Sequence, residues 1–294
     1  MENNKMTNQN KTNLKKQLGI ARDTAISLGR ETVAILNAGF YMTPGGNKIK
    51  IQESVNESIQ GTITYSPEVR LSNGIQLGNQ TVIEVKNETT LNAVKRLIAM
   101  GYADPVALNF ASAESPGGGF LHGALAQEEY LARSSALYFC LVNNPMYRYH
   151  QSHLDPFYSD YVIYSPEVVI MRDDDGNLLD MPYKSSIITS PAVHANGVRH
   201  YKPEQEKEIE GVMWKRILKV LAAAVEHKHN AIVLGAWGCG AFGNDGNEIA
   251  ALFKKALEEN FRGAFEYVIF AITDWSAEDR FIGPFLQAFN KEKS

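Results

Sequence analysis

Short, almost wholly apolar runs alternate with longer amphipathic stretches along the second half of the chain. Three of these runs read PVALNFAS (105–112), AIVLGAW (231–237) and YVIFAITD (267–274). Near-continuous apolar character over so few residues is typical of strands that are buried on both faces of a sheet. Long helical patterns are expected over residues 203–230 and 247–260. This alternation predicts a layered α/β fold whose sheet is at least partly parallel.

The length and the composition favour one domain after a polar N-terminal segment. The chain has 294 residues, of which 44% are hydrophobic, so it can bury a sizeable core. Residues 1–16 are polar and basic, and we expect them to form a disordered tail. No repeat or linker-like stretch follows, so residues 17–294 are predicted to form a single domain that opens with a helix from about Leu18 to Ala38.

The net charge and the cysteine content bear on which partners the protein binds and on the cellular compartment in which it is found. The net charge is −4, which argues against direct binding to nucleic acid through a basic surface. No apolar run reaches the length of a membrane span, and the N-terminus lacks the apolar core of a secretory signal. The two cysteines, Cys140 and Cys239, stand in unrelated contexts. They form no disulfide framework, so a cytoplasmic location is expected.

A first glycine-rich loop follows the apolar run at 105–112. Gly117, Gly118 and Gly119 lack Cβ atoms, so they can adopt positive φ and let a ligand approach the backbone amides closely. Such a loop directly before a helix suits an anion. The alternative is a turn that requires glycine for its conformation alone.

A second glycine-rich loop follows the apolar run at 231–237. It comprises Gly238, Cys239, Gly240, Ala241, Phe242 and Gly243 and contains the pattern G-x-G-x-x-G. A dinucleotide-binding Rossmann unit is disfavoured, because too few residues remain for further βα units and Asp274 lies beyond the usual ~20-residue spacing. We interpret the loop as a cradle for a diphosphate, facing the same cleft as the first loop. Phe242 either packs in the core or contacts a sugar.

Two adjacent carboxylates, Glu128 and Glu129, begin the helix after the first loop. Neighbouring helical residues point about 100° apart, so the two side chains are expected to have different roles. Acidic residues are also common in first helical turns because the helix dipole favours them. A carboxyl group close to bound phosphates would have a raised pKa, which suits a general acid for glycosidic cleavage.

Metal-binding patterns are weak. His227 and His229, and likewise His150 and His153, have no carboxylate or cysteine at a spacing that would complete a metal site. The segment RDDDGN (172–177) lacks the alternating ligands of a calcium loop and is interpreted as a solvated hairpin turn. Neither a metal nor a cofactor is therefore expected.

The spacing GGG-x7-QEE over residues 117–129, together with the segments LNFASAESPGGGF, IYSPEVVIMRDDDGNLLD and LGAWGCGAFGND, resembles the microbial-type poly(ADP-ribose) glycohydrolases. The resemblance covers nearly all of the chain after the tail, including a helical N-terminal extension at 17–58. It implies a macrodomain-like fold, in which a mixed β-sheet is sandwiched between helices. It also implies binding of ADP-ribose and metal-free hydrolysis of ribose–ribose O-glycosidic bonds in ADP-ribose polymers on modified proteins.

The resemblance implies roles for individual residues. Glu129 matches the catalytic acid, and Glu128 and Gln127 match residues that orient the distal ribose and the acid. Residues 117–119 and 238–243 match loops beside the diphosphate, Phe242 matches a ring that positions the ribose, and Asn109 matches a polar contact to that ribose. Hydrolysis of mono-ADP-ribose and recognition of ADP-ribose without cleavage remain alternatives. The adenine-binding residues, the choice between exo and endo cleavage and the oligomeric state are left open.

Overall fold

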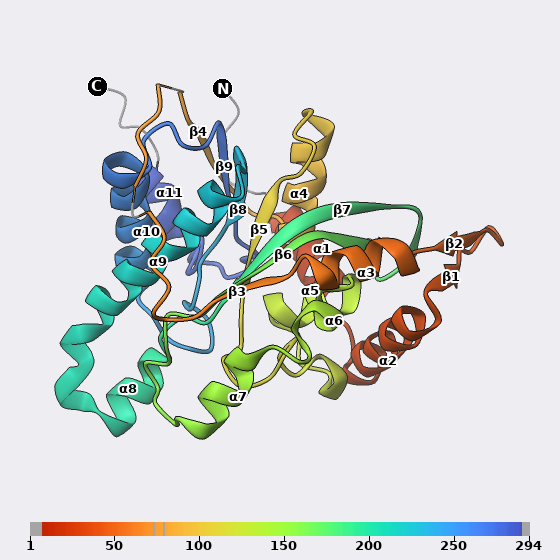
Figure 1. Cartoon of the computed structure of the whole chain (residues 1–294), viewed down its shortest axis with the longest axis horizontal. Helices are drawn as coiled ribbons and strands as arrows, with labels where there is room; N and C mark the ends of the chain where they lie inside the picture. Colours follow the sequence, from red (N-terminus) through yellow and green to blue (C-terminus); the bar gives the residue numbers. More distant parts are fainter. Residues whose placement is uncertain (1–7, 73, 79, 290–294) are drawn as a thin grey trace.

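The computed structural model describes residues 8–72, 74–78 and 80–289. Its main sheet has seven strands in the order β3-β6-β7-β5-β8-β9-β4 (Figure 1). The strands are β3 (Ile63–Tyr65), β4 (Val82–Lys86), β5 (Val106–Phe110), β6 (Val162–Arg172), β7 (Leu178–Ser190), β8 (Ala231–Leu234) and β9 (Tyr267–Ala271). The strands predicted from the apolar runs are confirmed.

The sheet is mixed, and its parallel part positions the two glycine-rich loops. β5 pairs in parallel with β7 on one side and with β8 on the other, whereas β6 is antiparallel to both β3 and β7. β9 extends the parallel part between β8 and β4. Because β5 and β8 are adjacent and parallel, the loops that leave their carboxyl ends emerge at the same edge of the sheet.

Alternate residues of the central strands pack against different helical layers. Val106 and Leu108 of β5 join the core formed with α9 (Ile209–Glu226), α10 (Gly246–Lys255) and α11 (Gly283–Phe289). Ala107, between them, packs on the opposite face with residues of α4 (Thr90–Ala99). Figure 1 shows α9, α10 and α11 on one side of the sheet and α4 on the other. Burial of both faces explains why these strands lack polar alternation.

Local capping defines the helices that flank the cleft. The hydroxyl of Thr89 accepts a 3.1 Å hydrogen bond from the Asn92 amide and begins α4. The carboxylate of Asp245 accepts bonds from the amides of Asn247 and Glu248 and begins α10 directly after the second loop. Side-chain oxygens at these positions satisfy amides that have no partner within the helix.

The N-terminal segment departs from the expected tail. Residues 1–7 lie outside the described part of the chain, but α1 (Asn8–Leu18) is helical where disorder was expected as far as residue 16. Leu14 is buried, and the Lys11 ammonium pairs with Asp279 and donates 2.8 Å to the Ser276 carbonyl. Contacts distant in the sequence therefore order this helix, which its polar composition alone does not predict.

The predicted N-terminal helix is present as α2 (Arg22–Ala38), and a short hairpin of β1 (Phe40–Met42) and β2 (Lys48–Lys50) separates it from α3 (Gln52–Gln60). The sequence did not predict α3, nor α7 (Pro145–Ser152), α8 (Ala195–Tyr201) and α11. The helix expected from Gln127 onwards is divided into α5 (Gln127–Ser134) and α6 (Leu137–Leu141), because Ser135 forms an antiparallel bridge with Ile170.

The long helix expected from residue 203 begins as a 3₁₀ segment, η2 (Pro203–Glu208), before α9. The helix expected over 247–260 ends in a π-helical turn, η3 (Ala256–Asn260). Within the described ranges, no helix combines the length and the apolar character needed to cross a bilayer.

Candidate active site

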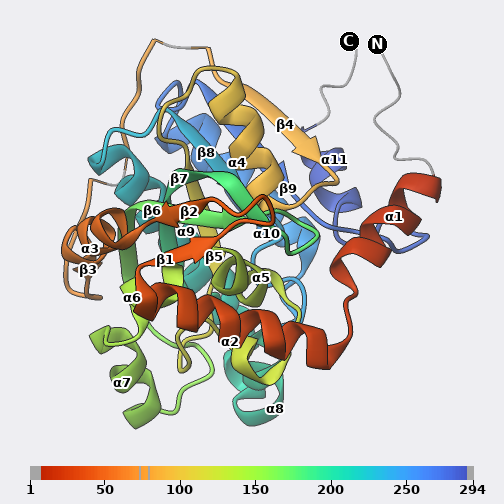
Figure 2. The same ribbon diagram turned by 90° about the vertical axis from the view of Figure 1, so that its right-hand side faces the viewer.

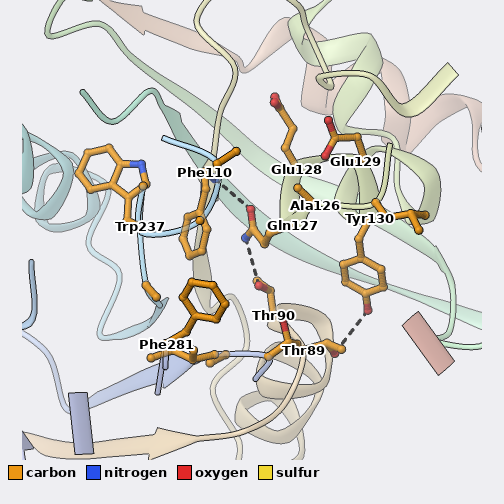
Figure 3. Close-up of a pocket in the computed structure, with 18 of the residues that line it drawn as sticks. Thr89, Thr90, Phe110, Ala126, Gln127, Glu128, Glu129, Tyr130, Trp237 and Phe281 are labelled. Atoms are coloured by element: carbon orange, nitrogen blue, oxygen red, sulfur yellow. Dashed lines mark hydrogen bonds between the residues drawn. The ribbon is translucent and has the colours of Figure 1, made fainter. Parts of the chain in front are cut away.

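The first glycine loop connects the carboxyl end of β5 to α5, whose first turn carries Gln127, Glu128 and Glu129. The Gln127 side chain ties this turn to the sheet. Its Oε1 accepts a 2.9 Å bond from the Phe110 amide, and its Nε2 donates to the carbonyl of Leu108 and the hydroxyl of Thr90 (Figure 3). Gln127 lines the cleft, but these bonds engage both ends of its amide, so its observed function is to position α5.

Glu128 is buried beneath this turn. Its Oε2 accepts a 2.6 Å bond from the Ser112 amide, and its Oε1 lies 3.3 Å from Nδ2 of Asn109. Burial, reinforced by the neighbouring charge of Glu129, raises the pKa of Glu128 to about 8, although the bonds from Ser112 and Asn109 oppose the shift. The carboxyl group is therefore largely protonated at neutral pH.

Glu129 faces the glycine loop. Its Oε1 accepts a 2.8 Å bond from the Gly119 amide. A Cβ atom at Gly118 would lie 2.2 Å from this oxygen and 3.1 Å from Oε2 of Glu128. The two carboxyl groups thus converge on the α-carbon of Gly118, where no other residue type leaves room for both.

The first loop contacts these carboxylates rather than the main cavity. Gly117 and Gly118 have positive φ values of 71° and 59°, as expected for a tight turn. In the described structure the group that accepts a hydrogen bond from the Gly119 amide of the loop is the Glu129 side chain. Gly117, Gly118 and Gly119 do not line the main cavity, which lies on the other side of Glu129.

Asn109 lies behind the site rather than in it. It is fully buried, does not line the main cavity and donates 3.3 Å bonds from Nδ2 to Glu128 and to Thr189. Its Oδ1 has no hydrogen-bond partner among the described residues. Glu128 is in contact with it, so Asn109 supports the carboxyl pair.

The second loop connects β8 to α10, and its glycines have two different functions. Gly238 and Gly243 have φ values of 75° and 73°, and a Cβ atom at either would collide with Asn244 or Asn196 at 2.5 Å or less. Gly240 has ordinary φ and nothing within 4 Å of a would-be Cβ atom. Gly238 and Gly243 therefore shape the loop, and Gly240 leaves open space in front of it.

Helix α8, which the sequence did not predict, holds this loop in place. The backbone amide of Asn196 donates a 2.9 Å hydrogen bond to the Phe242 carbonyl, and the side-chain Nδ2 of Asn196 donates to the Ala241 carbonyl. Arg199 donates 2.8 Å to the Gly243 carbonyl. In each of these bonds a carbonyl oxygen of the loop is the acceptor, so α8 fixes the loop through its carbonyl groups.

The main cavity has a volume of about 410 Å³ and extends from the carboxylates past the second loop. Of the predicted residues, it is lined by Gln127, Glu128, Glu129, Gly238, Gly240, Ala241 and Phe242. Cys239 and Gly243 do not line it. The thiol of Cys239 is buried, which raises its pKa to about 12 and makes it an unreactive packing group at neutral pH.

The far end of the cavity is aromatic and was not predicted. Phe110, Trp275 and Phe281 line it, and Figure 3 shows Phe110 and Phe281 close together. Trp275 and Phe281 belong to the segment after β9, which Asp274 organises by accepting bonds from the amides of Ser276, Phe281 and Ile282. Asp274, the acidic residue after the last strand, was the only sequence feature that could have pointed to this segment. It holds in place the segment that forms the aromatic end of the cavity.

Within the described ranges, no three histidine, cysteine, aspartate or glutamate side chains form a cluster that could hold a metal ion. The RDDDGN turn is more than a solvated hairpin, since Asp174 accepts bonds from Thr89, Asn92 and the Tyr130 hydroxyl. This turn therefore braces α5 against α4.

Comparison with known proteins identifies the family. The solved poly(ADP-ribose) glycohydrolase of Thermomonospora curvata is 42% identical, with a TM-score of 0.86, and the match covers 91% of this chain and 100% of that chain. This chain belongs to the microbial-type poly(ADP-ribose) glycohydrolase family. The family model described as "Microbial-type PARG, catalytic domain" matches residues 29–173. No curated protein matches.

Two ligand-bound members of the poly(ADP-ribose) glycohydrolase family are also similar. The T. curvata enzyme bound to the inhibitor ADP-HPD is 42% identical, with a TM-score of 0.84 over 91% of this chain and 100% of that chain. The Deinococcus radiodurans enzyme in complex with ADP-ribose is 39% identical, with a TM-score of 0.77 over 82% of this chain and 99% of that chain. The expected fold and family are confirmed.

Proposed function

We propose that this chain hydrolyses ribose–ribose O-glycosidic bonds in poly(ADP-ribose) and releases ADP-ribose. The observation that carries the proposal is the position of Glu129 at the wall of the main cavity, which the second loop also lines. The chain belongs to the glycohydrolase family identified above. The ligands of the solved relatives, ADP-ribose and ADP-HPD, are consistent with an ADP-ribose-binding cavity.

The cavity suggests how ADP-ribose is held. The aromatic end formed by Phe110, Trp275 and Phe281 suits the flat adenine base. The open space at Gly240 leaves room for the diphosphate to approach the backbone of the second loop. Phe242 of the second loop also lines the cavity and would then contact the distal ribose. This order brings the anomeric carbon of that ribose to Glu129.

In this mechanism Glu129 is the general acid. It gives its proton to the 2′ oxygen of the leaving unit as the anomeric C–O bond breaks, and the ring develops oxocarbenium character. A water molecule then attacks the anomeric carbon and returns a proton to Glu129. The Gly119 bond orients this carboxyl group through Oε1. Burial favours the protonated form of Glu128, so Glu128 adds little negative charge beside Glu129 once Glu129 has given up its proton.

Two other functions would use the same cavity: hydrolysis of mono-ADP-ribose from protein, and recognition without cleavage. The presence of both carboxyl groups disfavours recognition alone. Incubation with labelled poly(ADP-ribose) tests the choice, since the proposal expects release of free ADP-ribose. Binding without release would indicate a recognition module, and cleavage confined to mono-ADP-ribosylated protein would indicate the other hydrolase.

We further propose that the chain acts in the cytoplasm on ADP-ribose polymers attached to modified proteins, without binding nucleic acid directly. The free and buried state of Cys140 and Cys239 agrees with a reducing compartment. The overall charge of −4 offers little attraction for a phosphate backbone.

A further inference from the structure

A second cavity lies against the first glycine-rich loop and meets the main cavity at Ser112 and Glu129. Its volume is also about 410 Å³. It is lined by Ser112, Ser115, Pro116, Gly118, Gly119, Phe120, Leu121, His122, Glu129 and Tyr138. Gly118, Gly119 and the 3₁₀ turn η1 (Phe120–His122) therefore face this second cavity rather than the main one.

The two cavities share only Ser112 and Glu129 among their lining residues. A glycosidic bond has a sugar on each side of its oxygen, and the acid must reach that oxygen. If the distal ribose lies in the main cavity, the leaving group must extend from Glu129 in another direction. The second cavity begins at this carboxyl group and provides that direction.

The lining of the second cavity is suited to a nucleoside. Tyr138 of α6 is half-buried and packs on the buried ring of Phe120, with ring centroids 4.9 Å apart, so it presents a supported aromatic surface. Ser112 and Ser115 add hydroxyl groups to the lining, and these can bond sugar hydroxyls. Ser115 and His122 are exposed, so a ligand could extend from the cavity into solvent.

The N-terminal extension supports this cavity. Arg22, the first residue of α2, donates 3.0 Å from Nε to the His122 carbonyl and brings a positive charge to the rim. Further along α2, a Cβ atom at Gly29 would lie 3.0 Å from the Phe120 carbonyl oxygen, which shows how closely the helix packs on η1. Figure 2 shows α2 lying across the front of α5. A cation at this rim suits a ligand that continues into a diphosphate.

We propose that the second cavity is the subsite for the leaving ADP-ribose unit and that it receives the adenosine portion whose 2′ oxygen Glu129 protonates. This inference rests on the proposed polymer hydrolysis. In the second cavity the leaving unit would contribute binding energy of its own. A polymer should therefore be cleaved more efficiently than a glycoside with a small leaving group.

The test fills the cavity without altering the main one. Ser115→Trp places a large ring at an exposed position, and Ala251→Trp on α10 places the same ring at an exposed position on the other side of the sheet. Two substrates are compared: poly(ADP-ribose), and ADP-ribose carrying an O-methyl group at the anomeric carbon of its distal ribose. Methanol is a poor leaving group that also requires the acid, so this substrate reports on Glu129 without the leaving nucleoside.

We expect Ser115→Trp to lower kcat/KM for the polymer about 10-fold or more, roughly the value of one stacked base, while changing the methyl glycoside reaction less than about twofold. Ala251→Trp should leave both reactions near those of the unaltered chain. Melting temperature and ADP-ribose affinity check that the fold and the main cavity persist.

Equal slowing of both substrates by Ser115→Trp, or no slowing of either, would overturn the subsite and leave the proposed function in place. An unaltered chain that cleaves the methyl glycoside but not the polymer would overturn the proposed function, and the subsite with it.

Discussion

The backbone amide of Gly119 donates a 2.8 Å hydrogen bond to Oε1 of Glu129. This bond joins the glycine loop to the carboxyl group ten residues later in the sequence, so the spacing between them allows a direct contact. The loop orients the Glu129 carboxyl group on one side, and the main cavity lies on the other.

Replacing Gly118 with alanine should disable the acid. The new Cβ atom would lie 2.2 Å from Oε1 of Glu129, so the carboxylate must move. A displacement of about 1 Å at a catalytic group typically costs roughly 100-fold in turnover. The φ value of 59° adds strain of about 1–2 kcal/mol. Polymer turnover and melting temperature should be measured together.

Gly119→Ala is the matched control for this change, because Gly119 has ordinary φ and its Cβ atom would lie 3.8 Å from the same oxygen. We expect it to retain far more turnover. Comparable losses in the two variants would show that the loop as a whole, rather than the contact at Gly118, governs activity.

Gly240→Val should remove ADP-ribose binding from a folded protein. The position has ordinary φ and open space, so the branched side chain causes little strain and instead occupies the region assigned to the diphosphate. Saturating ADP-ribose should raise the melting temperature of the unaltered chain, by ligand linkage, and leave that of the variant unchanged. Gly211→Val on α9 also has open space and controls for the added bulk. A full ligand-induced rise in Gly240→Val would refute the diphosphate assignment.

The buried carboxyl group of Glu128 should make stability fall with rising pH. Its pKa is raised to about 8 in the folded protein, whereas an unfolded glutamate titrates near 4.5. Between these values the folded state binds more protons than the unfolded state, so each increase in pH favours unfolding. Glu128→Gln removes this group.

The melting temperature of Glu128→Gln, relative to that of the unaltered chain, should therefore rise between pH 5 and pH 8. The expected rise is several degrees, since each kcal/mol of stability shifts the melting temperature by roughly 2–4 °C. Glu128→Gln and the unaltered chain should be melted in parallel across this range. A difference that does not change with pH would mean that Glu128 is ionised in the folded protein.

Polymer hydrolysis should continue in the presence of a chelator such as EDTA. In the proposed mechanism Glu129 supplies the proton and the backbone of the second loop holds the diphosphate, so no step uses a metal ion. Loss of activity in EDTA that a divalent ion restores would contradict this mechanism.

The sequence predicted the parts of this molecule in which local pattern and topology agree. The apolar runs that became β5, β8 and β9 carry their own signal, and parallel strands necessarily bring their following loops to one edge. This is why the emergence of the two glycine loops at one edge of the sheet, and the start of α5 at the carboxylates, could be anticipated.

What the sequence missed depends on contacts that are distant along the chain. Helix α1 is ordered through Lys11 and Asp279, and the aromatic cavity end is assembled by Phe110 and Phe281 from different segments. The contact between the first loop and Glu129 was missed as well. The glycines predicted a site for an anion, and no local pattern indicated that the Gly119 amide would bond the side chain of Glu129.

The most direct test of the central claim is the product yield of Glu129→Gln on labelled poly(ADP-ribose), with calorimetric binding of ADP-ribose measured on the same preparation. Glutamine preserves the shape of the side chain but cannot donate an acidic proton. We predict that release of ADP-ribose falls about 1,000-fold or more, while affinity for ADP-ribose stays within a few-fold. Release near the rate of the unaltered chain, with ADP-ribose still bound, would show that Glu129 is not the acid.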